Sequence, residues 1–218
     1  MRSALAVANA LLNHAAVNGT ALSSDALHSL TYFAHGLRLA LVNDVLLDEV
    51  VMARRDGIFI EGLASAGAVG TRNIKGQLTQ VERLPNGLLS EKTPVLDAAD
   101  PACATLELVW SRFGRFSDYD LGLFARSAGS PWDEIWNNPE RLASKLSTVA
   151  KQAWQEDDAI EGALVIPNSL IRRWFRSLVI QEKKEQASAE GLEETIHAMS
   201  DRLEKTVRIS VEKKLRSA

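Results

Sequence analysis

Apolar residues recur at helical spacing in several stretches of this chain, and capping residues mark where those stretches begin and end. The first stretch runs from about Ser3 to Val17 and stops at Asn18-Gly19, a typical helix exit. The second starts at Ser23-Ser24-Asp25, whose side-chain oxygens can accept hydrogen bonds from free N–H groups. Its apolar stripe, which Tyr32 and His35 flank, comprises Leu27, Leu30, Phe33, Ala34, Leu37 and Leu41. The pattern predicts two amphipathic helices.

Further helix starts follow in the second half of the chain. Asp100-Pro101 predicts a helix through about Phe116. Ser117 with Asp120 three residues later resembles a capping box, and Ser130-Pro131-Trp132-Asp133 repeats that arrangement for a short helix. Two more helices are expected, one over Pro139–Gln155 and one opened by Ile166-Pro167-Asn168-Ser169 that carries Ile171, Trp174, Phe175, Leu178 and Val179.

The segment between the second and third predicted helices has a different character. Glu49–Met52 and Ile58–Ile60 favour extended backbone on either side of Arg54-Arg55-Asp56-Gly57, as a short hairpin or simply as extended chain. Residues 64–100 are rich in Gly, Ser, Thr, Asn and Pro and show no sustained period. This composition predicts a long surface loop with little regular structure, and loops of that length are often functional.

The last part of the chain, from Gln181 onward, contains no aromatic residue and no proline. Its apolar residues recur every three or four positions: Leu192, Ile196, Met199, Leu203, Val207, Val211 and Leu215. This pattern predicts one amphipathic, coiled-coil-like helix that folds back on the domain, pairs with a second copy or binds a partner. The expected fold is therefore mainly α. A single compact multi-helix domain over residues 1–180, with the short β-leaning segment and the long loop, precedes a helical extension over 181–218.

Composition narrows the class of protein. Of 218 residues, 46% are hydrophobic and 24% charged, which is typical of a globular protein rather than a disordered or membrane protein. The net charge of −3 gives no overall basic field that would attract nucleic acid. One cysteine, Cys103, cannot form an internal disulfide, so a reducing cytoplasm is expected. The apolar stretch Ala4–Leu12, interrupted by Asn9, is too short and polar for an export signal.

Candidate chemistry is sparse. Cys103 lies near a predicted helix start, where a thiol can become reactive, although a buried inert thiol is the ordinary interpretation. His28 and His35 are seven residues apart, which is not the spacing of helical metal ligands. The register of the glycines in Ala66–Gly70 does not match a phosphate-binding loop. We therefore expect no catalytic residues, no cofactor and no metal, with a Cys103-dependent enzyme as an alternative.

A second alternative is a nucleic-acid-binding regulator. Arg172, Arg173 and Arg176 share a predicted helix with Trp174 and Phe175, a mixture that can follow a phosphate backbone. The same arginines can lie along an amphipathic helix or meet an acidic protein instead. Because the net charge is negative, nucleic acid is the less favoured partner.

Several segments in order resemble the Panacea domain, the family of SocA-like antitoxins and phage-associated proteins. The similarity is carried by Leu27–Gly36, by Ser130-Pro131-Trp132 and by Ile166–Phe175. Ala53–Ile58 departs from the family pattern, since it keeps the glycine of a W-x-x-G-P-V segment and lacks its tryptophan and proline. The resemblance covers about residues 1–180 and is that of a divergent member.

The resemblance implies a helical, cytoplasmic, non-enzymatic protein-binding module from a prophage or another mobile element. Such a protein neutralises a toxin or acts as a proteolytic adaptor. The expected partner is a protein, homo-oligomers can form through the C-terminal helix, and no membrane is involved. The candidate partner-binding residues are Tyr32, Arg54, Arg55, Trp132, Trp136, Arg172 and Arg173, with core packing as the ordinary interpretation of the three aromatic residues.

Overall fold

The computed structural model describes residues 1–66, 70–74, 76–137 and 163–182. The chain divides into two units, residues 1–176 and 177–218, and the helices and strands from Ala4 to Val165 lie in the first unit. The helix expected over Pro139–Gln155 and the apolar face expected from Leu192 to Leu215 lie outside the described residues. About half of the described residues are helical, and two small antiparallel sheets accompany the helices.

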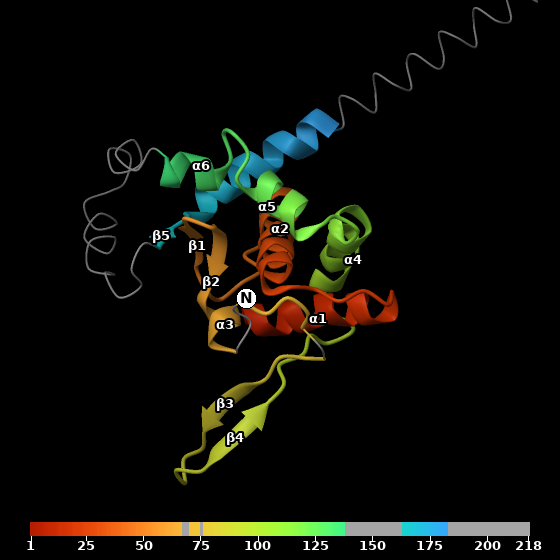
Figure 1. Cartoon of the computed structure of the whole chain (residues 1–218), viewed down its shortest axis with the longest axis vertical. Coiled ribbons are helices and arrows are strands. Elements are labelled where there is room, and N and C mark those ends of the chain that lie inside the picture. Colours follow the sequence, from red (N-terminus) through yellow and green to blue (C-terminus); the bar gives the residue numbers. More distant parts are fainter. Residues whose placement is uncertain (67–69, 75, 138–162, 183–218) are drawn as a thin grey trace, which may run out of the picture. The chain divides into compact units, whose positions relative to one another are not determined.

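Helix α2 (Ser24–Val42) is the central element of the first unit, and α1 (Ala4–Val17), α4 (Ala102–Phe113) and α5 (Asp118–Ala125) pack around it (Figure 1). The predicted start is confirmed, because the Ser23 hydroxyl accepts a hydrogen bond from the amide of Ala26 at 3.1 Å. The helix ends at Asn43 in the left-handed conformation, with φ 56°. Tyr32 and His35, which flank the predicted apolar stripe, are buried as well, so α2 is covered on more sides than the amphipathic pattern indicated.

The other capping signals also give real helix ends. Ser3 caps α1, which ends at Val17 as predicted. Ser117 caps α5, and its hydroxyl accepts a bond from the Asp120 amide at 3.2 Å. Ser130 caps α6 (Pro131–Trp136) in the same way. Helix α4 stops at Phe113, three residues before the predicted end, because the chain there turns toward the start of α5.

A three-stranded antiparallel sheet of order β2-β1-β5 lies beside α2. Strands β1 (Val51–Arg54) and β2 (Gly57–Ile60) form the hairpin that the sequence left open, with Arg54 opposite Gly57. The short helix α3 (Glu61–Ser65) follows β2. Strand β5 (Leu164–Val165) was not predicted, because two residues are too few to form a recognisable pattern.

The segment over residues 64–100 contains more order than its composition predicted. Strands β3 (Gln80–Arg83) and β4 (Leu89–Lys92) form an exposed hairpin (Figure 1). Its base is fixed to α1 by Asn9, whose amide nitrogen donates to the carbonyls of Leu78 and Pro94 at 2.9 and 2.8 Å. The Asn9 side-chain oxygen accepts from the Leu78 amide at 2.7 Å. Asn9, which interrupts an apolar stretch in the sequence, therefore anchors this segment to the core.

The glycine in the middle of α2 has a packing role. A Cβ atom at Gly36 would lie 2.6 Å from Cζ of Phe175 and closer still to two other ring atoms. The Phe175 ring therefore rests directly on the backbone of α2. It also packs against Tyr32 and Trp174, with ring centroids 5.4 and 4.8 Å apart. Gly36 thus allows the helix that carries Phe175 to approach α2 closely.

Candidate functional site

A cleft of about 470 Å³ opens between the N-terminal part of α2, the β1–β2 hairpin and α5. Three of the side chains that line the cleft stack on one another. The Arg54 guanidinium lies 3.8 Å from the centre of the Phe59 ring, and Phe59 stacks on the buried ring of His28 at 5.5 Å. The sequence indicated Arg54 as a candidate, but it gave no signal for Phe59, because the stack depends on the register of β1 and β2.

Charged side chains surround this cleft. Asp25, Asp56 and Asp118 line it and are exposed. The two arginines of the lining are held against aromatic rings: Arg54 over Phe59, and Arg126 with its guanidinium 6.0 Å from the centre of a Trp132 ring. Arg126 also donates to the Gly122 carbonyl at 3.1 Å. The carboxylates are therefore the charges that a visiting molecule meets most freely.

Three of the predicted partner-binding residues come together next to the cleft. The indole nitrogen of Trp132 donates to the carbonyl oxygen of Arg54 at 2.7 Å, across 78 positions of sequence. Trp132 also stacks on Trp136, with ring centroids 6.0 Å apart. Trp132 is nearly buried, whereas Trp136 is partly exposed. This contact ties α6 to the β1–β2 hairpin and so fixes one wall of the cleft.

The other predicted partner-binding residues lie elsewhere. Tyr32 is completely buried, and burial raises the pKa of its phenol, so it is a core residue rather than a surface residue. Arg55 is exposed in the turn between β1 and β2. Arg172 donates to Asn43 at 2.6 Å, and Arg173 pairs with Glu134 on α6 at 2.6 Å. The sequence grouped these arginines, but the structure joins two of them to different elements.

A row of apolar side chains on and just before α5 is exposed and was not predicted as a site. Phe116, Tyr119 and Leu123 follow one another at intervals of three and four residues, and their exposed fractions are 54%, 70% and 48%. Tyr119 also lines the cleft. The spacing is visible in the sequence, but only the structure shows that these side chains stay about half exposed or more, although the Phe116 ring lies 6.2 Å from the Phe113 ring at the end of α4.

The two histidines considered for chemistry accept backbone hydrogen bonds. Nδ1 of His28 accepts from the Ile60 amide at 3.1 Å, and Nδ1 of His35 accepts from the Leu47 amide at 3.4 Å. Nε2 of His35 lies 2.8 Å from the side-chain oxygen of Asn168, so it is the protonated nitrogen of the ring. Burial lowers the pKa of His35, and the bond to Asn168 partly opposes this. The His28 and His35 rings thus hold neighbouring segments against α2.

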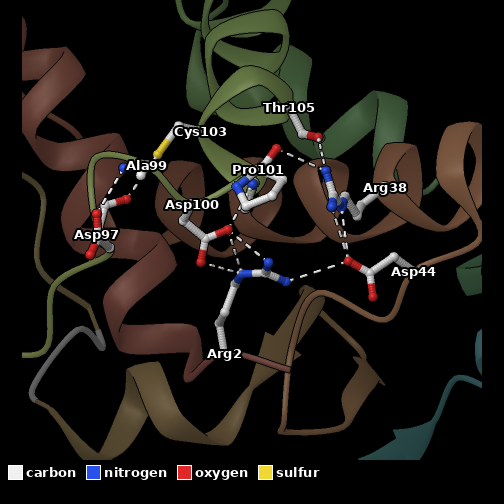
Figure 2. Close-up of polar contacts among 10 residues, drawn as sticks. Arg2, Arg38, Asp44, Asp97, Ala99, Asp100, Pro101, Cys103 and Thr105 are labelled. Carbon is white, nitrogen blue, oxygen red and sulfur yellow. Dashed lines mark hydrogen bonds and ion pairs between the residues drawn. The ribbon is translucent and has the colours of Figure 1, made fainter.

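The third candidate for chemistry, Cys103, borders a network of ion pairs (Figure 2). Its thiol donates to the Asp97 carbonyl at 3.5 Å. In the network, Asp100 binds the Arg2 guanidinium at 2.7 Å, and Arg2 also lies 3.5 Å from Asp44. The bond to Arg2 holds the pKa of Asp100 below its usual range.

The network continues from Asp44 to Arg38 at 3.1 Å, and Arg38 also donates to the Pro101 carbonyl at 2.8 Å. Charges of alternating sign thus join the start of the chain, the end of α2 and the start of α4 (Figure 2). Because each of these charges is matched by its neighbours, and Arg38 also binds a backbone carbonyl, this cluster has the character of a structural network.

The part of the chain that the structure describes contains neither a metal-ligand cluster nor a membrane-spanning helix. Among residues 1–66, 70–74, 76–137 and 163–182, no three potential metal-ligating side chains from His, Cys, Asp and Glu lie together. No helix over those same residues is both long enough and apolar enough to cross a membrane. Comparison with known proteins gave no matching family, no similar curated protein and no similar solved structure.

Proposed function

We propose that this protein is a non-enzymatic protein-binding module whose contact surface consists of the cleft and the exposed row Phe116, Tyr119 and Leu123. The observation that carries the proposal is that row. Two aromatic rings and a leucine, each about half exposed or more, lie on and just before α5, and Tyr119 among them also lines the cleft of mixed charge. Exposed aromatic residues of this kind supply much of the binding energy in protein interfaces.

The resemblance to the Panacea domain supplies the proposed class of partner. We infer an antitoxin-like role, in which the protein binds a toxin or delivers a bound protein to a protease, in the cytoplasm of a bacterium that carries a prophage or mobile element. The segment that departs from the family pattern supports a partner specific to this chain. Arg54, Asp56, Gly57 and Ile58 of that segment line the cleft. Homo-oligomer formation through residues 181–218 remains part of the proposal.

The two alternative functions receive less support. For nucleic acid, the three arginines would have to face one phosphate backbone, whereas Arg172 and Arg173 bind Asn43 and Glu134. For an enzyme, Cys103 would need an activating base. Its thiol donates to a backbone carbonyl, while His28 and His35 accept bonds from the backbone of other segments.

The proposal is tested by placing a photo-crosslinking amino acid, benzoylphenylalanine, at position 119 in the full chain expressed in its own host. Val17, 86% exposed at the end of α1, is the control position. We expect one discrete protein adduct at position 119 that is absent at position 17. Against the purified partner, Tyr119→Ser should weaken binding about tenfold or more, and Val17→Ser should leave it unchanged. Identical adducts at both positions, or none at position 119, would overturn the proposal.

A further inference from the structure

The outer edge of β2 faces the cleft, and a hydrogen bond reveals which of its backbone groups point outward. Among the strands that the structure describes, β2 pairs with β1 alone. The Ile60 amide points away from β1, because it donates to Nδ1 of His28 on α2 at 3.1 Å. Backbone groups alternate in direction along a strand, so the N–H and C=O groups of Ile58 point outward as well.

The hydrogen bonds on the other side of β1 confirm which residues of β2 direct their backbone groups outward. Val51 stands opposite Ile60, and its carbonyl accepts a bond from the Ile166 amide at 2.8 Å on the far side of β1. Val51 and Ile60 therefore direct their backbone groups away from each other, and the next such pair is Ala53 and Ile58. Ala53 uses its outward side to pair with Leu164 of β5.

Within the described part of the chain, no residue bonds the outward amide or carbonyl of Ile58. Gly57, Ile58 and Phe59 all line the cleft, so this length of strand borders the space between β2 and two of the helices that contact it, α2 and α5. An unpaired strand edge along a cleft is a template for backbone pairing with an added chain.

The charges around the edge define what kind of chain fits. The carboxylates of Asp25, Asp56 and Asp118 are exposed around the cleft. The guanidinium groups of Arg54 and Arg126 are instead held over Phe59 and beside Trp132. A strand that carries lysine or arginine side chains would place them among the three carboxylates and its apolar side chains near the Phe59 ring.

We propose that the partner binds by strand addition: an extended, basic segment pairs its backbone with Ile58 and becomes a fourth strand beside β2. The inference rests on the proposed function, because it specifies how the same cleft receives a protein. It names the recognised feature as an extended backbone with positively charged side chains, and it assigns Asp25, Asp56 and Asp118 to charge recognition.

The test uses the full chain with two fluorescent eight-residue peptides, one of alternating valine and lysine and one of alternating valine and glutamate. We expect the lysine peptide to bind in fluorescence anisotropy and the glutamate peptide to bind at least fivefold more weakly. Amide hydrogen exchange at Ile58 should slow when the lysine peptide is bound. Exchange at Ile60, whose amide is already bonded to His28, should remain slow throughout.

Three variants separate backbone pairing from charge. Ile58→Pro removes an outward N–H that does not bond to β1, and it should weaken binding of the lysine peptide about tenfold. Asp56→Lys should weaken it about fivefold, whereas Asp48→Lys, an equal charge change at an exposed residue outside the cleft, should have no effect. Asp56→Lys keeps the test decisive if Ile58→Pro impairs folding.

The proposal is overturned if the lysine peptide shows no saturable binding at about 1 mM, if the glutamate peptide binds more tightly, or if Ile58 exchange stays fast in the complex. A partner that crosslinks at position 119 while these peptides fail would leave the protein-binding function intact and refute strand addition alone. Failure of both experiments would refute the function itself.

Discussion

The contact between Gly36 and Phe175 gives the sharpest stability prediction. Gly36→Ala adds one methyl group to the buried centre of α2, at a position where the Phe175 ring already rests on the backbone. On helix propensity alone, the substitution should stabilise the protein by about 1 kcal/mol, because alanine loses less backbone entropy than glycine in a helix. The packing of Phe175 therefore predicts a lower free energy of unfolding for this substitution, whereas helix propensity predicts a higher one.

The free-energy cost of overpacking should exceed the gain from helix propensity. The new Cβ would lie 2.6 Å from Cζ of Phe175 and closer still to Cδ2 and Cε2, so the ring would have to move by roughly 1.5 Å to regain a normal carbon–carbon separation. Tyr32, Phe33 and Trp174 surround the ring, and Phe175 is 1% exposed. Forcing an extra carbon into a filled core costs about 3 kcal/mol at the upper end of the usual range. After the propensity gain, we expect a net loss of about 2 kcal/mol in the free energy of unfolding.

Urea unfolding followed by tryptophan fluorescence and circular dichroism measures this loss. The control is Gly122→Ala in α5, where the new Cβ would meet only the end of Arg126 at 3.5 Å, an ordinary contact. This variant should be neutral or gain up to about 1 kcal/mol. Combining Gly36→Ala with Phe175→Leu should cost less than the sum of the single changes, since the smaller side chain leaves room. If Gly36→Ala behaved like Gly122→Ala, the close approach of Phe175 to α2 would be refuted.

Two further predictions concern charge. Asp100→Asn should lower the free energy of unfolding at pH 7 by about 1–3 kcal/mol, because it removes the carboxylate that binds Arg2 and accepts the Ala102 amide. The lowered pKa of Asp100 means that its contribution is complete at neutral pH and is lost as the pH falls through the folded-state value, so the variant and the native chain should converge in acid. His35 also has a lowered pKa, so its neutral ring contributes fully above the unfolded value of about 6.5, and stability should decrease below it by at most about 1.4 kcal/mol per pH unit. His35→Gln should remove that part of the slope in urea titrations between pH 7.5 and 5.5, and an unchanged slope would contradict the assignment.

The elements that the sequence predicted well are those determined by short-range chemistry. Ser3, Ser23, Ser117 and Ser130 each cap a helix, because a side-chain hydroxyl satisfies an amide only three residues away. The β1–β2 hairpin is also local, but the sequence left open whether this segment is a hairpin or simply extended chain. Such bonds depend on a few neighbouring residues, so their signals can be recognised without knowing the rest of the fold.

Residues whose partners lie far away in the sequence were not predictable in the same way. The role of Gly36 is to allow the close approach of Phe175, and the role of Asn9 is to bond the backbone of Leu78 and Pro94. His35 was expected beside an apolar stripe, and its bonds to distant groups place it in the core. The hairpin β3–β4 was missed because its strands are exposed on both faces and so lack an alternating pattern.

The candidate site contains two kinds of residue: those that hold the cleft in shape and those that a partner would contact. Trp132 and His28 are nearly buried and bind the backbone of Arg54 and Ile60, so they fix the position of the β1–β2 hairpin. Asp56 and Tyr119 are exposed on either side of the opening. Because an exposed side chain contributes little to folding, substitutions at the second pair should change partner binding without unfolding the protein. Changes at the first pair should instead reduce stability and binding together, which provides a direct way to tell the supporting residues of this surface from its contact residues.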